Sequence, residues 1–207
     1  YSDPLGLSPD AVAAGGSSSI SPSLRLRLLT VEEGRSCQVS NGPAKRYFNI
    51  SQAAWKTQLK TDVHLIQVGS VDQLVEPTAK TILTSGSSEF LQRHGKSGVV
   101  TVVFTESLQP PYNLPNWLIG TVRGYTPPAE TVPHLGVFIS TKYAKPNTLT
   151  HELGHILLGP GHTDMDSYNK EFEISEPKRN LMQPDGDLLL LSPKQIQRAR
   201  EGAAGLI

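Results

Sequence analysis

The chain has 207 residues, and 19 Lys and Arg balance 19 Asp and Glu, so its formal net charge is zero. This length allows one compact domain, and a hydrophobic content of 37% is enough to build a core. Zero net charge excludes a bulk attraction to nucleic acid or anionic membranes. No apolar run approaches the ~20 residues of a membrane span. We therefore expect neither nucleic acid nor a membrane span.

The single cysteine, Cys37, excludes an intrachain disulfide, so the fold does not depend on an oxidising compartment. No basic segment followed by an apolar one opens the chain, as it would in a Sec-type signal peptide. If the protein is secreted, we expect another export route, or a parent protein larger than this chain.

Residues 1–23 are rich in Ser, Gly, Pro and Ala and have no apolar period. This composition is typical of a flexible linker. We therefore expect a linker over residues 1–23 and one folded domain over residues 24–207.

Strand and helix patterns alternate after the linker. Leu24, Leu26 and Leu28 alternate with arginines, which predicts a half-buried strand, and the β-branched run 99–104 predicts a central buried one. Further strands are expected at 63–68, 117–122 and 135–140. One strand within 117–140 should lie at a sheet edge and pair with an extended peptide. Helices are expected at 51–60, in part of 78–93, at 149–158 and at 193–201. This order predicts an α+β fold whose N-terminal part is of the α/β type.

The most informative segment is HELGH, residues 151–155, in the last predicted helix but one. Positions four apart lie above one another on a helix, so His151 and His155 share a face at a separation that one small cation can bridge. Leucines 149, 153 and 157, together with Ile156, are expected on the opposite face, towards the core.

Gly159 and Pro160 should end this helix, and the chain then delivers His162. Three neutral imidazoles with one open position form a typical catalytic zinc set. Glu152 follows the first ligand directly, which places its carboxylate beside a zinc-activated water. We therefore expect Glu152 to act as the general base, and Zn²⁺ to be the cofactor.

The string HELGHILLGPGH resembles the metzincin clan of zinc endopeptidases, whose motif is HExxHxxGxxH. One extra residue lies between His155 and Gly159, which gives the variant HExxHxxxGxxH. Residues 180–184 (NLMQP) resemble the methionine turn of that clan. The resemblance implies a twisted sheet, an active-site helix, a methionine turn with Met182 beneath the histidines, and a closing C-terminal helix. It also implies an endopeptidase that acts on proteins or peptides.

Three alternatives remain open at this point. Asp164 or Asp166 could replace His162 as the third ligand. In gluzincin-like peptidases a Glu serves instead, and Glu173 or Glu176 lies near the required spacing. A zinc-stabilised binding module without catalysis is the alternative from another class, although such a site needs no base and is more often closed by a fourth protein ligand.

Residues 3–7 (DPLGL) resemble the DPxGL-type motif that ends the core of rearrangement-hotspot (Rhs) repeat proteins. This resemblance implies a bacterial toxin domain that a specialised apparatus, often of type VI, delivers into a target cell. It also implies an Rhs shell and a cognate immunity protein as partners.

Overall fold

The fold is described from a computed structural model, which describes residues 21–32, 41–75, 81–83, 86–109, 122–184 and 189–206. Residues 1–20 and Cys37 lie outside these ranges, so the proposed linker and domain boundary stay predictions. Among the described helices, none is long and apolar enough to cross a bilayer.

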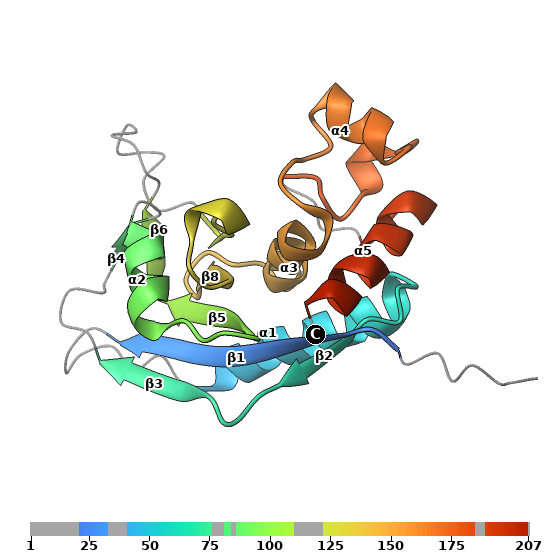
Figure 1. The fold of residues 1–207 in the computed structure, drawn as a ribbon. Helices are drawn as coiled ribbons and strands as arrows, with labels where there is room; N and C mark the ends of the chain where they lie inside the picture. Colours follow the sequence, from blue (N-terminus) through green and yellow to red (C-terminus); the bar gives the residue numbers. More distant parts are fainter. Residues whose placement is uncertain are drawn as a thin grey trace, which may run out of the picture.

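A six-stranded mixed sheet forms the base of the molecule (Figure 1). Its order is β2-β1-β5-β8-β7, and β3 also pairs with β1. All these pairs are parallel except β7 with β8. The strands are β1 (Ser23–Glu32), β2 (His64–Gln67), β3 (Asp72–Val75), β5 (Val100–Thr105), β7 (Gly124–Tyr125) and β8 (Gly136–Ser140).

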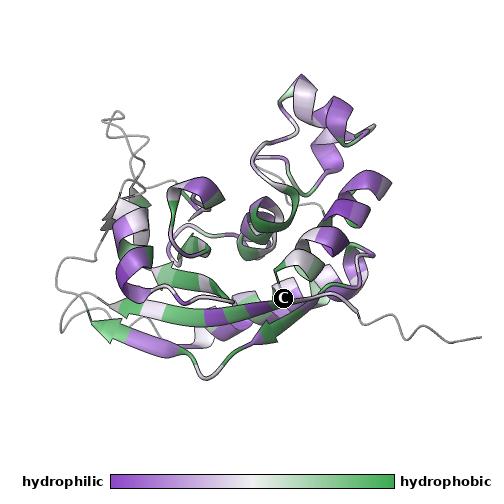
Figure 2. Cartoon of the chain, viewed as in Figure 1, coloured by the Kyte–Doolittle hydropathy of each residue, from purple (hydrophilic) through white to green (hydrophobic). Residues whose placement is uncertain are grey.

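The central position of β5 was expected from its β-branched sequence. All six of its residues are buried, and the strand is apolar along most of its length in Figure 2. β1 divides its side chains between the two faces of the sheet. Leu24, Leu26 and Leu28 belong to the larger core cluster, whereas Leu29 and Val31 belong to a second cluster with Phe90.

The three longest of the described helices contribute to the larger cluster. α1 (Asn41–Ala53) continues as the π-helix η2 (Ala54–Gln58), so the expected helix at 51–60 begins earlier than predicted. α3 (Thr148–Leu158) and α5 (Pro193–Gly205) lie side by side, as Figure 1 also shows. The second cluster is covered by α2 (Ser87–His94).

The helix expected in part of 78–93 is confirmed as α2, and residues before it form a strand. β4 (Thr81–Leu83) is a strand that pairs with β6 (Ser107–Gln109), and the helical part is α2. The β-branched Thr81 and Ile82 explain why an extended segment wins here. Of the strand expected at 117–122, only Val122 is described, and it bridges to Leu108.

The C-terminal third consists of short helices and loops before α5. These include α4 (Asp166–Glu171) and the 3₁₀ turn η5 (Pro177–Arg179), whereas the 3₁₀ turn η4 (Ala129–Thr131) lies earlier, between β7 and β8. α5 begins as expected. Ser192 accepts a hydrogen bond from the Gln195 amide, and the Gln195 side chain returns to the Ser192 amide. The mixed sheet with packed helices confirms the α+β class.

Candidate metal centre and cleft

α3 positions two of the three histidines. Leu149, Leu153 and Leu157 are buried in the core and hold the opposite side of the helix. His151 and His155 therefore point away from the core, with ring centroids 4.9 Å apart. Ile156 differs from expectation, because it is only half-buried and lines the cleft described below.

A glycine turn brings His162 back to the same place. Gly159 ends α3 with a φ of 90°, and Gly161 has a φ of 129°. Residues other than glycine rarely adopt backbone conformations with such φ values. A Cβ on Gly161 would also lie 2.5 Å from a ring carbon of Tyr168. The turn is therefore closely packed against α4. The extra residue of the motif lies before this turn, within α3, which extends to Leu158.

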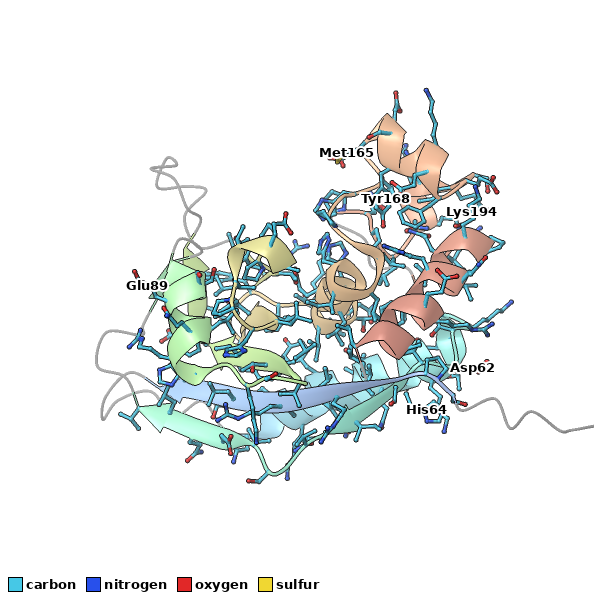
Figure 3. The ribbon with its side chains drawn as sticks, viewed as in Figure 1. Asp62, His64, Glu89, Met165, Tyr168 and Lys194 are labelled. Carbon is cyan, nitrogen blue, oxygen red and sulfur yellow. The ribbon has the colours of Figure 1, made fainter. Side chains whose placement is uncertain are left out.

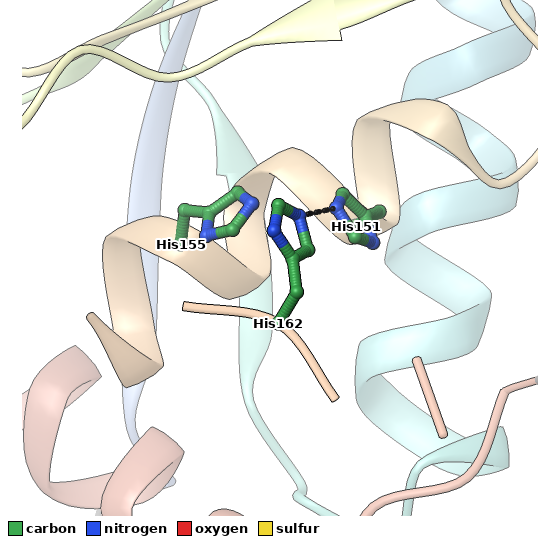
Figure 4. Close-up of side chains that lie close together, drawn as sticks. All are labelled: His151, His155 and His162. Atoms are coloured by element: carbon green, nitrogen blue, oxygen red, sulfur yellow. Dashed lines mark hydrogen bonds between the residues drawn. The ribbon is translucent and has the colours of Figure 1, made fainter. Parts of the chain in front are cut away.

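The three imidazoles form one cluster (Figure 4). One ring nitrogen from each of His151, His155 and His162 lies within 4.8 Å of the others. The Nε2 atoms of His151 and His162 are 3.2 Å apart. Two nitrogens bound to one tetrahedral zinc at about 2.05 Å stand about 3.3 Å apart, so the cluster fits a metal site of this kind.

The methionine turn orients the first histidine from behind. Nδ1 of His151 lies 2.7 Å from the backbone oxygen of Leu181, which can only accept a hydrogen bond. The proton therefore belongs on Nδ1, and the Nε2 lone pair faces the cluster. Met182 is fully buried, and a Cβ on Gly154 of α3 would lie 2.5 Å from its sulfur. The turn thus packs directly against the histidine helix.

Burial also keeps the histidines neutral. Desolvation lowers the pKa of His151 and of His162. The pKa of His155 falls to about 3, mainly through desolvation and further through the charges of His151 and His162. Neutral imidazole is the form that binds a metal ion. The environment therefore prepares all three side chains as ligands.

Glu152 lies in the same cleft but is only 6% exposed. Burial raises its pKa to about 7, and a hydrogen bond from Thr126 partly opposes this rise. The Thr126 hydroxyl lies 2.7 Å from Oε2 of Glu152. A carboxyl whose pKa lies near neutrality suits general acid–base chemistry.

The histidines and Glu152 open into a cleft of about 630 Å³. Its walls come from β7 and the segment that follows, from α3 and its terminal turn, and from Pro184 beside the methionine turn. β7 is the last strand of the sheet, which confirms the expected edge strand. Within the part of the chain that the structure describes, the cleft therefore runs beside this last strand of the sheet.

The alternative ligands are not brought to this site. Among the described residues, the only group of three or more potential ligands is the histidine cluster, so neither Asp164 nor Asp166 joins it. Glu173 pairs with Lys194 at 2.8 Å, and Glu176 pairs with Arg179 at 2.8 Å. Both glutamates are exposed, and this contradicts the gluzincin-like arrangement.

Sequence reasoning missed three contributors to the site. Thr126 and Gly124 contact Glu152 from the edge strand, and the Leu181 carbonyl holds His151. None belongs to the histidine motif. The turn-rich composition of 123–133 did not indicate a role for Thr126 or Gly124. A backbone carbonyl such as that of Leu181 leaves no mark in the sequence.

Comparisons with known proteins agree on the fold. No family model and no curated protein matches the sequence. Two solved structures resemble this one. Metalloproteinase-II of Bacteroides fragilis has 14% identity and a TM-score of 0.58 over 89% of this chain, which spans only 54% of that protein. Mature mirolysin of Tannerella forsythia, solved with a cleaved peptide, has 13% identity and a TM-score of 0.55, with 90% and 96% of the two chains covered. The chain therefore shares the fold of these two proteins, and it carries the cluster of His151, His155 and His162 described above.

Proposed function

We propose that this protein is a zinc-dependent endopeptidase that hydrolyses peptide bonds of a protein or peptide substrate. The observation that carries this proposal is the convergence of His151, His155 and His162 beside the buried Glu152, in a cleft along a sheet edge. The cleaved peptide seen with mirolysin adds support from a protein of the same fold.

In this proposal His151, His155 and His162 hold the zinc ion, and Met182 supports them from below. Zinc supplies Lewis-acid activation of a water molecule and of the scissile carbonyl. Glu152 takes a proton from the attacking water and passes it to the leaving amine nitrogen. The edge strand β7 aligns the extended substrate by backbone hydrogen bonds.

Metal content and peptide cleavage, measured on the same samples, test the proposal. We expect the wild type to hold one zinc and to cut peptides from a library. Glu152→Gln should keep the zinc but lose cleavage, and His162→Ala should lose the zinc. Glu89→Gln, an exposed glutamate on α2 (Figure 3), and His64→Ala are matched controls that should behave like the wild type.

Two outcomes would contradict the proposal. A wild type without zinc would exclude the mechanism. A wild type that holds zinc and cleaves no library peptide would favour the zinc-stabilised binding module.

We further propose that the protein is a toxin domain delivered into a target cell by a specialised secretion system, with an Rhs shell and an immunity protein as partners. Only the DPLGL motif and the linker-like composition after it support this. Expression inside a bacterial host tests it: growth should stop with the wild type and continue with Glu152→Gln. Normal growth at equal protein levels would argue against a bacterial target.

A further inference from the structure

The carboxylate of Glu152 is enclosed by the short segment that begins at the edge strand. The Thr126 hydroxyl lies 2.7 Å from Oε2 and 3.0 Å from the backbone oxygen of the same residue. A hydroxyl has one proton to donate. A hydrogen bond to an ionised carboxylate is the shorter and stronger kind, so donation to Oε2 prevails.

The other carboxylate oxygen, Oε1, lies against the backbone of Gly124. A Cβ on Gly124 would lie 2.5 Å from Oε1 and 2.6 Å from Cγ of Glu152. Real Cβ atoms do not approach other atoms so closely, so the absent side chain of Gly124 is what makes room for Glu152. The carboxylate therefore lies between the backbone of β7 and the hydroxyl of Thr126.

We propose that Thr126 is a positioning residue for Glu152, and that its hydroxyl fixes the carboxylate in one orientation within the cleft. This inference rests on the proposed function, in which Glu152 is the general base. A base contributes to catalysis only within hydrogen-bond reach of the proton that it takes. A carboxylate free to rotate would spend part of its time in unproductive orientations.

In this proposal the strand that binds the substrate lies next to the residue that orients the general base. Thr126 follows β7 directly, and β7 packs against α3. A peptide that adds to this edge therefore docks beside the residue that orients Glu152. Loss of the hydroxyl should lower kcat and leave KM nearly unchanged, because the hydroxyl acts on the base and not on peptide binding.

Thr126→Val and Thr126→Ser separate the hydroxyl from the shape of the side chain. Valine keeps the branched shape without the hydroxyl, and serine keeps the hydroxyl. Thr57→Val is the matched control, since Thr57 is exposed and its hydroxyl donates to the backbone oxygen of Ala53 at the end of α1, away from the cleft. For each variant we would measure kcat, KM, zinc content and the thermal midpoint, and determine a crystal structure.

We expect kcat of Thr126→Val to fall roughly 10- to 100-fold, with KM and zinc content unchanged. Thr126→Ser and Thr57→Val should retain most of the wild-type kcat. Wild-type kcat in Thr126→Val would overturn the inference. So would an equal loss in Thr126→Ser, because side-chain shape and not the hydroxyl would then matter.

The crystal structures keep the inference separable from the proposed function. A zinc-loaded wild type that cuts nothing would refute the proposed function alone. The orientation of Glu152 would then decide the inference: a displaced carboxylate in Thr126→Val supports it, and an unchanged carboxylate overturns it. If the thermal midpoint of Thr126→Val drops, the orientation of Glu152 in its crystal structure, compared with the wild type, again decides whether the inference holds.

Discussion

Nδ1 of His151 lies 2.7 Å from the backbone oxygen of Leu181, thirty residues further along the chain. This contact joins the helix that carries two histidines to the methionine turn. It fixes both the tautomer and the ring orientation of His151 without help from a side chain. The metal centre is therefore assembled by tertiary packing from three separate segments: α3, the turn that carries His162, and the methionine turn.

A metal site of this kind should stabilise the folded chain, because the three nitrogens meet only when it is folded. Zinc at 100 times its dissociation constant adds about 2.7 kcal/mol, which corresponds to roughly 5–10 °C in a chain of this size. We expect a chelator to lower the thermal midpoint by this amount, and added zinc to restore it. His162→Ala should not respond, and an equal response in that variant would place the metal elsewhere.

The two methionines of the chain provide a matched pair for the support beneath the histidines. Met182 is fully buried against Gly154, whereas Met165 is 49% exposed. Met182→Ala should lower the free energy of unfolding by about 2–5 kcal/mol, because it leaves a cavity. Met165→Ala should stay within about 0.5 kcal/mol of the wild type. Urea denaturation measures both, and equal costs would exclude a packing role for Met182.

Zinc content of the Met182 variants adds a second test. Met182→Leu keeps most of the side-chain volume and should cost less than about 1.5 kcal/mol. It should therefore retain the metal. Loss of zinc in this variant at wild-type stability would mean that the thioether itself, and not its packing, supports the site.

The sequence predicted the parts of the molecule whose signal is local. The leucine spacing predicted α3, the capping residues predicted the start of α5, and the β-branched run predicted β5. β4 was missed because a three-residue strand has no period to detect, and its partner β6 is remote in sequence. Thr126 was missed for a related reason: its role exists only because the sheet places β7 beside α3.

Tyr168 on α4 should make stability depend on alkaline pH. Its side chain is 4% exposed, and burial raises its pKa from the usual 10 of a tyrosine to about 12. Unfolded chains therefore ionise first, so the contribution is complete below pH 10 and is lost as the pH rises towards 12. Two pKa units correspond to at most about 2.7 kcal/mol.

The variant Tyr168→Phe removes this titration. Between pH 8 and pH 11, the wild type should lose more unfolding free energy than the variant does. At pH 8 the two should differ only by the loss of the Gln195 hydrogen bond to the hydroxyl, about 1 kcal/mol. Parallel pH curves would show that the hydroxyl does not titrate as proposed. Figure 3 labels Tyr168 on α4.

Gln195 connects the start of α5 to the methionine turn. Its Oε1 accepts from the Ser192 amide at 2.9 Å and from Nδ2 of Asn180 at 2.7 Å. Oδ1 of Asn180 in turn accepts from the Met182 amide at 3.0 Å. Gln195 and Asn180 are both buried, so a donor left without its acceptor here has no water to replace it.

Gln195→Ala should therefore destabilise the fold by about 2–4 kcal/mol, as the sum of a lost helix cap and a buried unpaired donor. Gln197→Ala, two residues further along α5, removes an exposed side chain that bonds only Glu201 within the same helix. It should cost less than about 0.5 kcal/mol. If the link to the methionine turn matters, Gln195→Ala should also bind zinc more weakly than Gln197→Ala does, because His151 loses its fixed carbonyl partner. Equal zinc affinity in the two variants would limit Gln195 to the helix cap, and the turn would then hold His151 by its own packing against α3.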